Sequence, residues 1–240
     1  MILKRFRLLS WNIGQGGAKR SAAIVDALVR HNPDVIFLQE YRIASVPAIV
    51  RPLKEHGWSH VANNLTRPNI SSLCVLSRTK LKPLVTPLDC PDPRRWLMLQ
   101  IEGIQGTFTN LHIPPTGKGS LKKPFWDCIL KHAQAQLKSP SMFVGTLNTG
   151  LPRIDEEGRS FVCSASFRQL GELGYSDLWR NFHGAKREYS WYSHYGNGFR
   201  VHNAFGSPEM SKRVARCDFD HSPHETGSSS HSMLIIDLHA

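Results

Sequence analysis

Short runs of apolar residues, separated by glycine, proline and polar turns, recur along most of the chain. The first run covers residues 7–13 and is ended by a glycine-rich stretch. Ser21 is a fair N-cap, and apolar side chains then recur at helical spacing from Ala22 until His31, Asn32 and Pro33 stop them. Residues 34–40 form a compact apolar run that ends in an acid. This order of strand, glycine loop, helix and strand predicts an α/β fold.

The same texture continues to the end of the chain. We find no repeat of fixed period, no low-complexity segment and no linker rich in Gly, Ser or Pro, so one domain over residues 1–240 is favoured. Two stretches of mixed strands and helices, similar in size, predict two packed sheets with helices outside. Further strands are expected at residues 72–77, 96–101, 106–112, 142–147, 189–192, 200–205, 214–219 and 233–238, and further helices at 124–137 and 164–173.

Composition narrows the class of protein. Of the 240 residues, 40 % are hydrophobic and 20 % are charged, which is typical of a globular chain. No apolar run approaches the roughly 18–20 residues of a membrane span, and the N-terminus enters a strand pattern too soon for a signal peptide. We therefore expect a cytoplasmic protein that does not enter the membrane. The cysteines are odd in number and never in CxxC spacing, which predicts buried thiols in a reducing compartment: Cys74, Cys90, Cys128, Cys163 and Cys217.

Charge adds an expectation about partners. Thirty Lys and Arg against nineteen Asp and Glu give a formal net charge of +11, and such an excess attracts polyanions. Nucleic acid or a phosphoester ligand is favoured, although a basic balance without any specific partner is the alternative. Lys118, Lys122 and Arg200 are the candidate phosphate-binding residues. Nothing in the sequence calls for an oligomer, so a monomer is expected.

Seven short segments follow one another along the chain in the order of the motifs of a known family. Together they resemble the endonuclease/exonuclease/phosphatase superfamily, closest to its exonuclease III-like and apurinic endonuclease-like branch, and the resemblance covers the whole chain. The segments are SWNI at 10–13, LQE at 38–40, NLH at 110–112, VGTLN at 144–148, YSWY at 189–192, GFRVHNAFGS at 198–207 and SSHSMLIIDL at 229–238.

The resemblance implies a fold and a chemistry. The fold is a four-layered α/β sandwich of the DNase I-like type, with two packed mixed sheets flanked by helices and a cleft at one edge. The chemistry is metal-dependent hydrolysis of phosphodiesters or phosphomonoesters by a nuclease or phosphatase. A Mg²⁺ ion takes hard oxygen ligands, a carboxylate orients the attacking water and an imidazole neutralises charge that develops on phosphorus.

Five residues match the family by position. Asn12 and Glu40 match the Asn of the first strand and the metal-binding Glu. Asn148 matches the Asn that closes the family's Gly-Asp-x-Asn turn, and His231 matches the histidine of its Ser-Asp-His motif. His112 stands where the family places a Tyr or His near the phosphate.

The acidic positions of the family carry other residues in this chain. Thr146 replaces the Asp that orients water, His202 replaces the Asp that bonds the catalytic histidine, and Ser230 replaces an Asp near the metal. Gly14 occupies a position that is often Asp in the apurinic-site nucleases. Glu40 is the one acid left, and a single carboxylate predicts a weak Mg²⁺ site.

These departures predict that the metal-dependent activity is lost, as in a pseudoenzyme or an engineered scaffold with the family fold. Without an oriented water and a partner for the histidine, the rate falls by at least the roughly 10²- to 10⁴-fold range of a positioned acid or base.

Other readings remain open on the sequence alone. One is a metal-free ester hydrolase that pairs Ser230, Thr146 or Cys74 with His202 or His231. Another is a residual nuclease that recruits Mg²⁺, and a further one is a nucleic-acid-binding protein without catalysis. The two histidines at 202 and 231 are also candidate ligands for Zn²⁺ or Ni²⁺.

Overall fold

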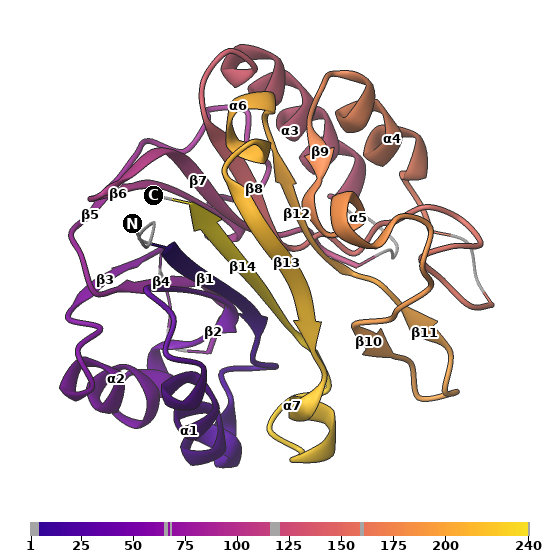
Figure 1. Cartoon of the computed structure of the whole chain (residues 1–240). Helices are drawn as coiled ribbons and strands as arrows, with labels where there is room; N and C mark the ends of the chain where they lie inside the picture. The colour runs from indigo at the N-terminus through magenta and orange to yellow at the C-terminus, as the bar shows by residue number, and fades with distance from the viewer. Residues whose placement is uncertain (1–4, 65–66, 68, 116–120, 159–160, 240) are drawn as a thin grey trace.

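A computed structural model describes residues 5–64, 67, 69–115, 121–158 and 161–239, and it contains two six-stranded sheets (Figure 1). The strands of both sheets run in mixed directions. In the first sheet β1 and β2 are parallel and the other neighbours are antiparallel. Its spatial order is β13 (Val214–Asp220), β14 (Met233–His239), β1 (Arg5–Asn12), β2 (Val35–Tyr41), β4 (Ser72–Ser77) and β3 (His60–Asn63).

The second sheet has one parallel pair, β7 with β8, among antiparallel neighbours. Its spatial order is β5 (Leu81–Pro83), β6 (Trp96–Ile101), β7 (Ile104–His112), β8 (Ser141–Thr146), β12 (His202–Gly206) and β9 (Ser176–Asp177).

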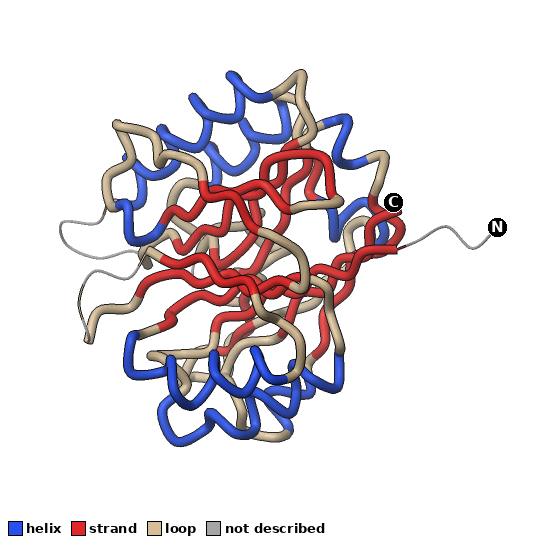
Figure 2. Tube along the Cα trace, turned by 90° about the vertical axis from the view of Figure 1, so that its left-hand side faces the viewer, coloured by secondary structure: helices blue, strands red, loops and turns tan. Residues whose placement is uncertain are grey.

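The two sheets pack face to face and helices cover their outer faces, as Figure 2 shows. One buried cluster joins side chains of both sheets, such as Phe37 and Phe108. A second cluster packs the first sheet against helices α1 (Ser21–His31) and α2 (Arg51–Glu55), and a third packs the second sheet against α3 (Lys122–Gln136) and α4 (Ser164–Glu172). The predicted four-layered sandwich is confirmed.

Strand β2 explains why the core strands are apolar on both faces. Side chains alternate across a strand, so Val35 and Phe37 enter the cluster between the sheets while Ile36 and Leu38 enter the cluster under the helices. Both sets are buried because each sheet lies between two layers. Gln39 and Glu40 then bring polar groups near the end of the strand, before the buried Tyr41 that closes it.

Shorter elements complete the fold. A two-stranded hairpin projects beside the lower ends of the large sheets in Figure 1. No helix among the described residues is long and apolar enough to cross a membrane. The remaining elements are β10 (Trp191–Tyr192), β11 (Gly198–Phe199), α5 (Leu178–His183), α6 (Pro208–Ser211), α7 (Ser222–Glu225), η1 (Ala18–Arg20), η2 (Ile43–Ser45), η3 (Val46–Val50) and η4 (Pro93–Arg95).

The two ends of the described chain lie in adjacent strands. In the antiparallel pair of β1 and β14, Arg5 is opposite His239 and Ser10 is opposite Leu234. The first and last described residues therefore meet at one end of the sheet, and Asn12 lies at the other end.

Candidate functional site

The candidate site is formed where strands of both sheets end at the same edge. Asn12 ends β1 and Glu40 lies near the end of β2, which is parallel to β1. In the other sheet the register places His112 of β7 opposite Thr146 of β8, and Thr146 opposite His202 of β12. Residues that are far apart in the sequence are thus brought together by strand register.

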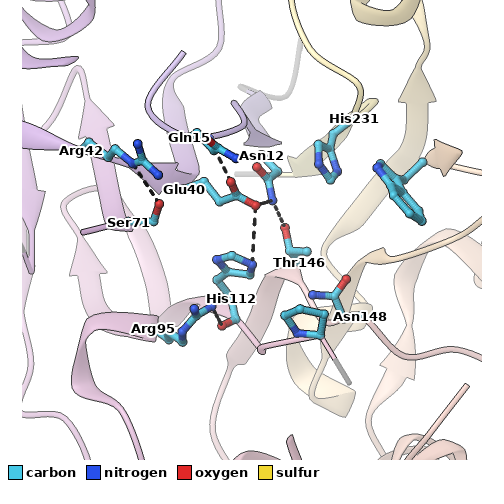
Figure 3. A pocket seen from close by; sticks show the side chains of 12 residues that line it. Asn12, Gln15, Glu40, Arg42, Ser71, Arg95, His112, Thr146, Asn148 and His231 are labelled. Carbon is cyan, nitrogen blue, oxygen red and sulfur yellow. Dashed lines mark hydrogen bonds and ion pairs between the residues drawn. The ribbon is translucent and has the colours of Figure 1, made fainter. Parts of the chain in front are cut away.

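These ends surround a pocket of about 440 Å³ (Figure 3). Its lining contains one carboxylate, two guanidinium groups and two imidazoles. The residues are Asn12, Gln15, Glu40, Arg42, Ser71, Arg95, His112, Pro115, Thr146, Asn148, Trp191 and His231. The structure therefore gathers the predicted residues Asn12, Glu40, His112, Thr146, Asn148 and His231 in one place.

The Glu40 carboxylate is held by its neighbours on both oxygens. Oε1 accepts a hydrogen bond from Nδ2 of Asn12 at 3.1 Å, and Oε2 accepts one from the backbone N–H of Gln15 at 2.9 Å. The backbone of Glu40 has φ 56°, a left-handed conformation that residues other than glycine rarely adopt. Burial alone would raise the pKa of Glu40, but the nearby His112 and these hydrogen bonds outweigh it and hold the pKa below its ordinary value. Glu40 is therefore a fixed, ionised group.

His112 faces Glu40 across the pocket as a neutral ring at pH 7. Its Nε2 lies 3.9 Å from Oε1 of Glu40, and its side chain is almost fully buried. Burial, and then the positive charge of Arg95, lower the pKa of His112 to about 4. The Arg95 guanidinium also donates to the carbonyl oxygen of His112 at 3.3 Å.

Thr146 occupies the centre of the site as a buried hydroxyl. Its Oγ1 accepts from Nδ2 of Asn12 at 3.2 Å and donates to Oε1 of Gln39 at 3.3 Å. A hydroxyl engaged in this way does not take a proton from water, so the position lacks a group that orients and activates an attacking water molecule.

His202 and His231 form a hydrogen-bonded pair behind the pocket. Nε2 of His202 lies 3.0 Å from Nδ1 of His231. Among the described residues Nδ1 of His202 is buried without a hydrogen-bond partner. Because an unpaired buried N–H is the costlier alternative, we assign the proton to Nε2 of His202, which donates to Nδ1 of His231.

This direction of donation fixes the chemistry of His231. Its own proton then lies on Nε2, so the ring presents a donor there and no lone pair. Burial lowers the pKa of His231 to about 4, and burial lowers the pKa of His202 well below its ordinary value. An aspartate at position 202 would accept a hydrogen bond from Nδ1–H of His231 and would leave Nε2 of His231 as a base. With His202 in that place, His231 is a neutral hydrogen-bond donor.

Asn148 lines the pocket on a strained turn. Its backbone has φ 49°, and its side-chain Nδ2 donates to the carbonyl oxygen of Ile113 at 2.8 Å. The amine of Lys122, at the start of α3, donates to the carbonyl oxygen of Asn148. Asn148 is thus held from two sides, and Lys122 belongs to the support of the site.

The pocket offers few oxygen ligands to Mg²⁺, which takes near-octahedral oxygen coordination. Glu40 is the one carboxylate in its described lining, and each oxygen of that carboxylate accepts one hydrogen bond. Oδ1 of Asn12 accepts from the backbone N–H of Gly14 at 3.0 Å. No cluster of three or more His, Cys, Asp or Glu side chains that could hold a metal occurs in the described ranges. For Zn²⁺ or Ni²⁺, the facing nitrogens of His202 and His231 are already engaged with each other.

We expect Mg²⁺ to bind only in the millimolar range or more weakly, because one hydrogen-bonded carboxylate supplies too little charge to offset dehydration of the ion. Isothermal titration calorimetry measures this directly, with a Glu40→Gln variant as the matched control. A micromolar dissociation constant that is lost in Glu40→Gln would contradict the expectation.

Three predicted phosphate-binding residues need separate comment. Arg200 is fully buried and forms ion pairs with Asp155 at 2.7 Å and Asp177 at 2.6 Å, so its prediction is wrong. Lys122 is 3 % exposed and bonded to Asn148, so it is no surface contact for phosphate. Lys118 lies outside the described residues.

The nucleophiles of the metal-free hydrolase are also not in place. Ser230 is exposed and does not line the pocket, and no hydrogen bond joins it to His202 or His231 in the described structure. Cys74 is fully buried in β4, and burial raises the pKa of its thiol. Since Thr146 bonds to Asn12 and Gln39, none of the three candidates has an imidazole partner.

The structure adds residues that the sequence motifs missed. Arg42 follows β2, and its Nε donates to Oγ of Ser71 at 3.2 Å at the pocket wall. Arg95 ends η4, where its Nε lies 3.4 Å from the Asp92 carboxylate, which pairs more closely with Arg94. Trp191 stacks on His231 with ring centroids 6.3 Å apart. The position of Arg42 two residues after Glu40 was a usable signal, whereas nothing in the sequence tied residue 95 to the pocket.

Comparisons with known proteins agree on the fold. A sequence profile of the Endonuclease/Exonuclease/phosphatase family matches residues 9–200. An AP endonuclease from Archaeoglobus fulgidus is similar with a TM-score of 0.82 at 18 % identity, over 96 % of this chain and 98 % of the other. A 3′-5′ exonuclease, NExo, from Neisseria meningitidis gives 0.83 at 17 % identity, over 98 % and 100 %. A Neisseria 3′ phosphatase NExo bound to a product DNA hairpin gives 0.82 at 18 % identity, over 98 % and 100 %. Among curated protein sequences, none matches the chain.

Proposed function

The chain belongs to the endonuclease/exonuclease/phosphatase family, and from that premise we propose that it binds phosphate groups of nucleic acid in its pocket without metal-dependent hydrolysis. In this proposal the protein is a pseudoenzyme. Nucleic acid is the favoured ligand because the chain carries a net charge of +11 and a structural relative was solved with a DNA hairpin. The proposal is the same whether the replaced acids arose naturally or by design.

The charge balance of the pocket carries the proposal. Glu40 supplies one negative charge, Arg42 and Arg95 supply two positive charges, and His112 and His231 are neutral at pH 7. A pocket with this balance attracts a phosphate directly, because guanidinium groups donate charge-assisted hydrogen bonds to its oxygens. A site with three additional carboxylates would repel phosphate until a divalent cation neutralised it.

The replacements also remove the means of hydrolysis. Thr146 stands where the family has a water-orienting carboxylate, and its hydroxyl is engaged with Asn12 and Gln39. In the tautomer assigned above, His231 presents an N–H to the ligand instead of a base. The same two changes thus favour binding of an anion over attack on it.

A binding measurement tests the proposal. We expect a fluorescently labelled oligonucleotide to bind with the same dissociation constant in Mg²⁺ and in EDTA, and to remain uncut. Arg95→Met is expected to weaken binding about tenfold, since one charge-assisted hydrogen bond is worth roughly 1.5 kcal/mol. Fluorescence anisotropy at fixed salt gives both numbers.

Arg30→Met is the matched control. Arg30 is exposed in the last turn of α1, which runs back from the site end of β1, so this guanidinium lies at the far end of the sheet. Equal losses for Arg95→Met and Arg30→Met would mean that binding follows net charge and not the pocket. Binding that disappears in EDTA, or cleavage of the oligonucleotide that needs Mg²⁺, would overturn the proposal.

A further inference from the structure

A pair of cysteines outside the pocket has so far played no part. Cys90 lies in the loop between β5 and η4, and Cys128 lies on the buried side of α3. Both belong to the cluster between α3 and the second sheet, with exposures of 8 % and 3 %.

The loop is fastened to the helix beside this pair. The Asp89 carboxylate accepts from Nζ of Lys131 at 2.6 Å, and its other oxygen lies 3.8 Å from Sγ of Cys128. Cys90 is the next residue, and its backbone N–H donates to the carbonyl oxygen of Pro87 at 3.0 Å, which closes a turn. The turn and the ion pair therefore hold Cys90 beside the middle of α3, between Cys128 and Lys131.

We propose that Cys90 and Cys128 form a reversible disulfide that locks residues 84–92 onto α3 when a peroxide is present. Both thiols are free in the reduced structure described here. The site is one for oxidative modification, and it is independent of the proposed function of the pocket.

The electronic asymmetry of the pair suits this reaction. The side chain of Cys128 interacts with the Cys90 thiol, and this contact, opposed by burial, lowers the pKa of Cys90. The same contact and burial raise the pKa of Cys128. Cys90 is therefore the sulfur that ionises and attacks, and Cys128 is the thiol that resolves the intermediate.

The chemistry balances with one molecule of hydrogen peroxide. The Cys90 thiolate attacks one peroxide oxygen, the O–O bond breaks, and a sulfenic acid and water form after proton uptake. Sγ of Cys128 then attacks Sγ of Cys90, the S–O bond breaks, and the departing hydroxide takes the thiol proton. Two thiols and one peroxide give one disulfide and two waters.

Access to Cys90 is provided by its own loop. Leu88 is 103 % exposed and Val85 is 83 % exposed, so this segment presents apolar side chains to solvent. A small oxidant reaches Cys90 when the loop opens locally, which breaks the Asp89–Lys131 ion pair and the turn at Pro87. The segment leads through η4 to Arg95, so the disulfide would also restrain the approach to the pocket wall.

The test is oxidation of the full-length protein with a few equivalents of hydrogen peroxide. We expect titratable thiols, counted after denaturation, to fall from five to three. Peptide mass spectrometry should give one cross-linked species that joins Cys90 to Cys128 and is 2 Da lighter than the two free peptides. The cross-link closes a loop of roughly 40 residues, so Tm should rise by about 5–10 °C and return on addition of dithiothreitol.

Serine variants distinguish a disulfide between Cys90 and Cys128 from non-specific oxidation of the other thiols. Cys90→Ser and Cys128→Ser should each abolish the cross-link and the Tm increase. Cys163→Ser should keep both, although Cys163 is the only cysteine described as partly exposed. Circular dichroism confirms that each variant folds, and the wild-type redox cycle tests the proposal if a serine variant does not. Loss of the Cys163 thiol alone, a cross-link through another cysteine, or no change in thiol count would overturn it.

Discussion

The combined substitutions Thr146→Asp, His202→Asp and Ser230→Asp are expected to produce Mg²⁺-dependent phosphoesterase activity, at least 10²- to 10⁴-fold above that of the unaltered chain. Asp at 146 supplies a carboxylate in the centre of the site, where the Thr146 hydroxyl now accepts from Nδ2 of Asn12 at 3.2 Å. Asp at 202 reverses the hydrogen bond to His231 and frees Nε2 as a base. Asp at 230 adds one negative charge at the residue before His231, at an exposed position outside the pocket lining.

No single one of these substitutions is expected to suffice. A bound metal without an oriented water raises the rate little, and so does a histidine without its carboxylate partner, because these groups act as a unit. The assay is release of phosphate or nucleotides from small phosphoesters and oligonucleotides, with and without EDTA. The matched control carries Asn at the same three positions, which keeps the shape and polarity but not the charge.

If the triple Asp variant folds, binds Mg²⁺ and cleaves none of these substrates, the positional matching of the acids is wrong or the cleft has another shape. Gly14 is then the next position to consider. A Cβ added there would lie 3.1 Å from the Arg20 guanidinium, and its backbone has φ +59°, so an Asp at position 14 also requires Arg20 to move.

The free energy of unfolding is expected to fall by several kcal/mol as pH is lowered from about 6.5 toward 5 and below. His112 and His231 have pKa values of about 4 in the folded chain, against the ordinary histidine value of 6.5 in the unfolded chain. Above pH 6.5 the rings are neutral in both states and stability is complete. Below pH 6.5 these histidines bind protons in the unfolded chain but stay neutral in the folded chain. The free energy of unfolding therefore decreases as pH falls toward 4.

Each of these two pKa differences corresponds to about 3 kcal/mol when fully expressed, and their sum is smaller because the two rings interact through the shared pocket. Urea denaturation at pH 8, 6.5, 5.5 and 5 gives the stability curve. Replacing His112 by Asn should flatten the curve, whereas His56→Asn should not, because His56 is exposed at the end of α2. A wild-type stability at pH 5 equal to that at pH 8 would refute the buried, neutral state of the histidines.

Much of the fold was predictable because long apolar runs define its strands. The helix expected after Ser21 is α1 (Ser21–His31), in which Arg20 is the N-cap and Ser21 is already helical, and the strand expected at 72–77 has those bounds as β4. Short elements were not predicted, since three or four residues carry no period. Thus β3 (His60–Asn63) and α5 (Leu178–His183) were missed, and the strand expected at 189–192 is reduced to Trp191–Tyr192.

The order of the family motifs along the chain was enough to predict the residues that meet in the site. It was not enough where a side chain is paired with a residue remote in the sequence. Glu40, Thr146 and His231 meet as expected because each ends or borders a core strand. The role of Arg200 depends on Asp155, which lies 45 positions away and is invisible to any local pattern. From sequence alone, a basic side chain in a loop motif is therefore predicted to contact a ligand. The buried counter-ion that shows otherwise is seen only in the structure.

The pairing of Arg5 with His239 bears on how this chain can be rewired. Opposed residues of an antiparallel pair lie within roughly 4.5–5.5 Å, so a short linker can join the two ends without disturbing β1 or β14. A circular permutant closed there can be opened at the tip of the β10–β11 hairpin, where Tyr195 is 80 % exposed. Such a permutant moves the chain ends from the edge of Arg5 and His239 to the tip of the hairpin whose first strand carries the pocket residue Trp191. A reporter group attached there would lie on the same hairpin as a residue of the pocket lining.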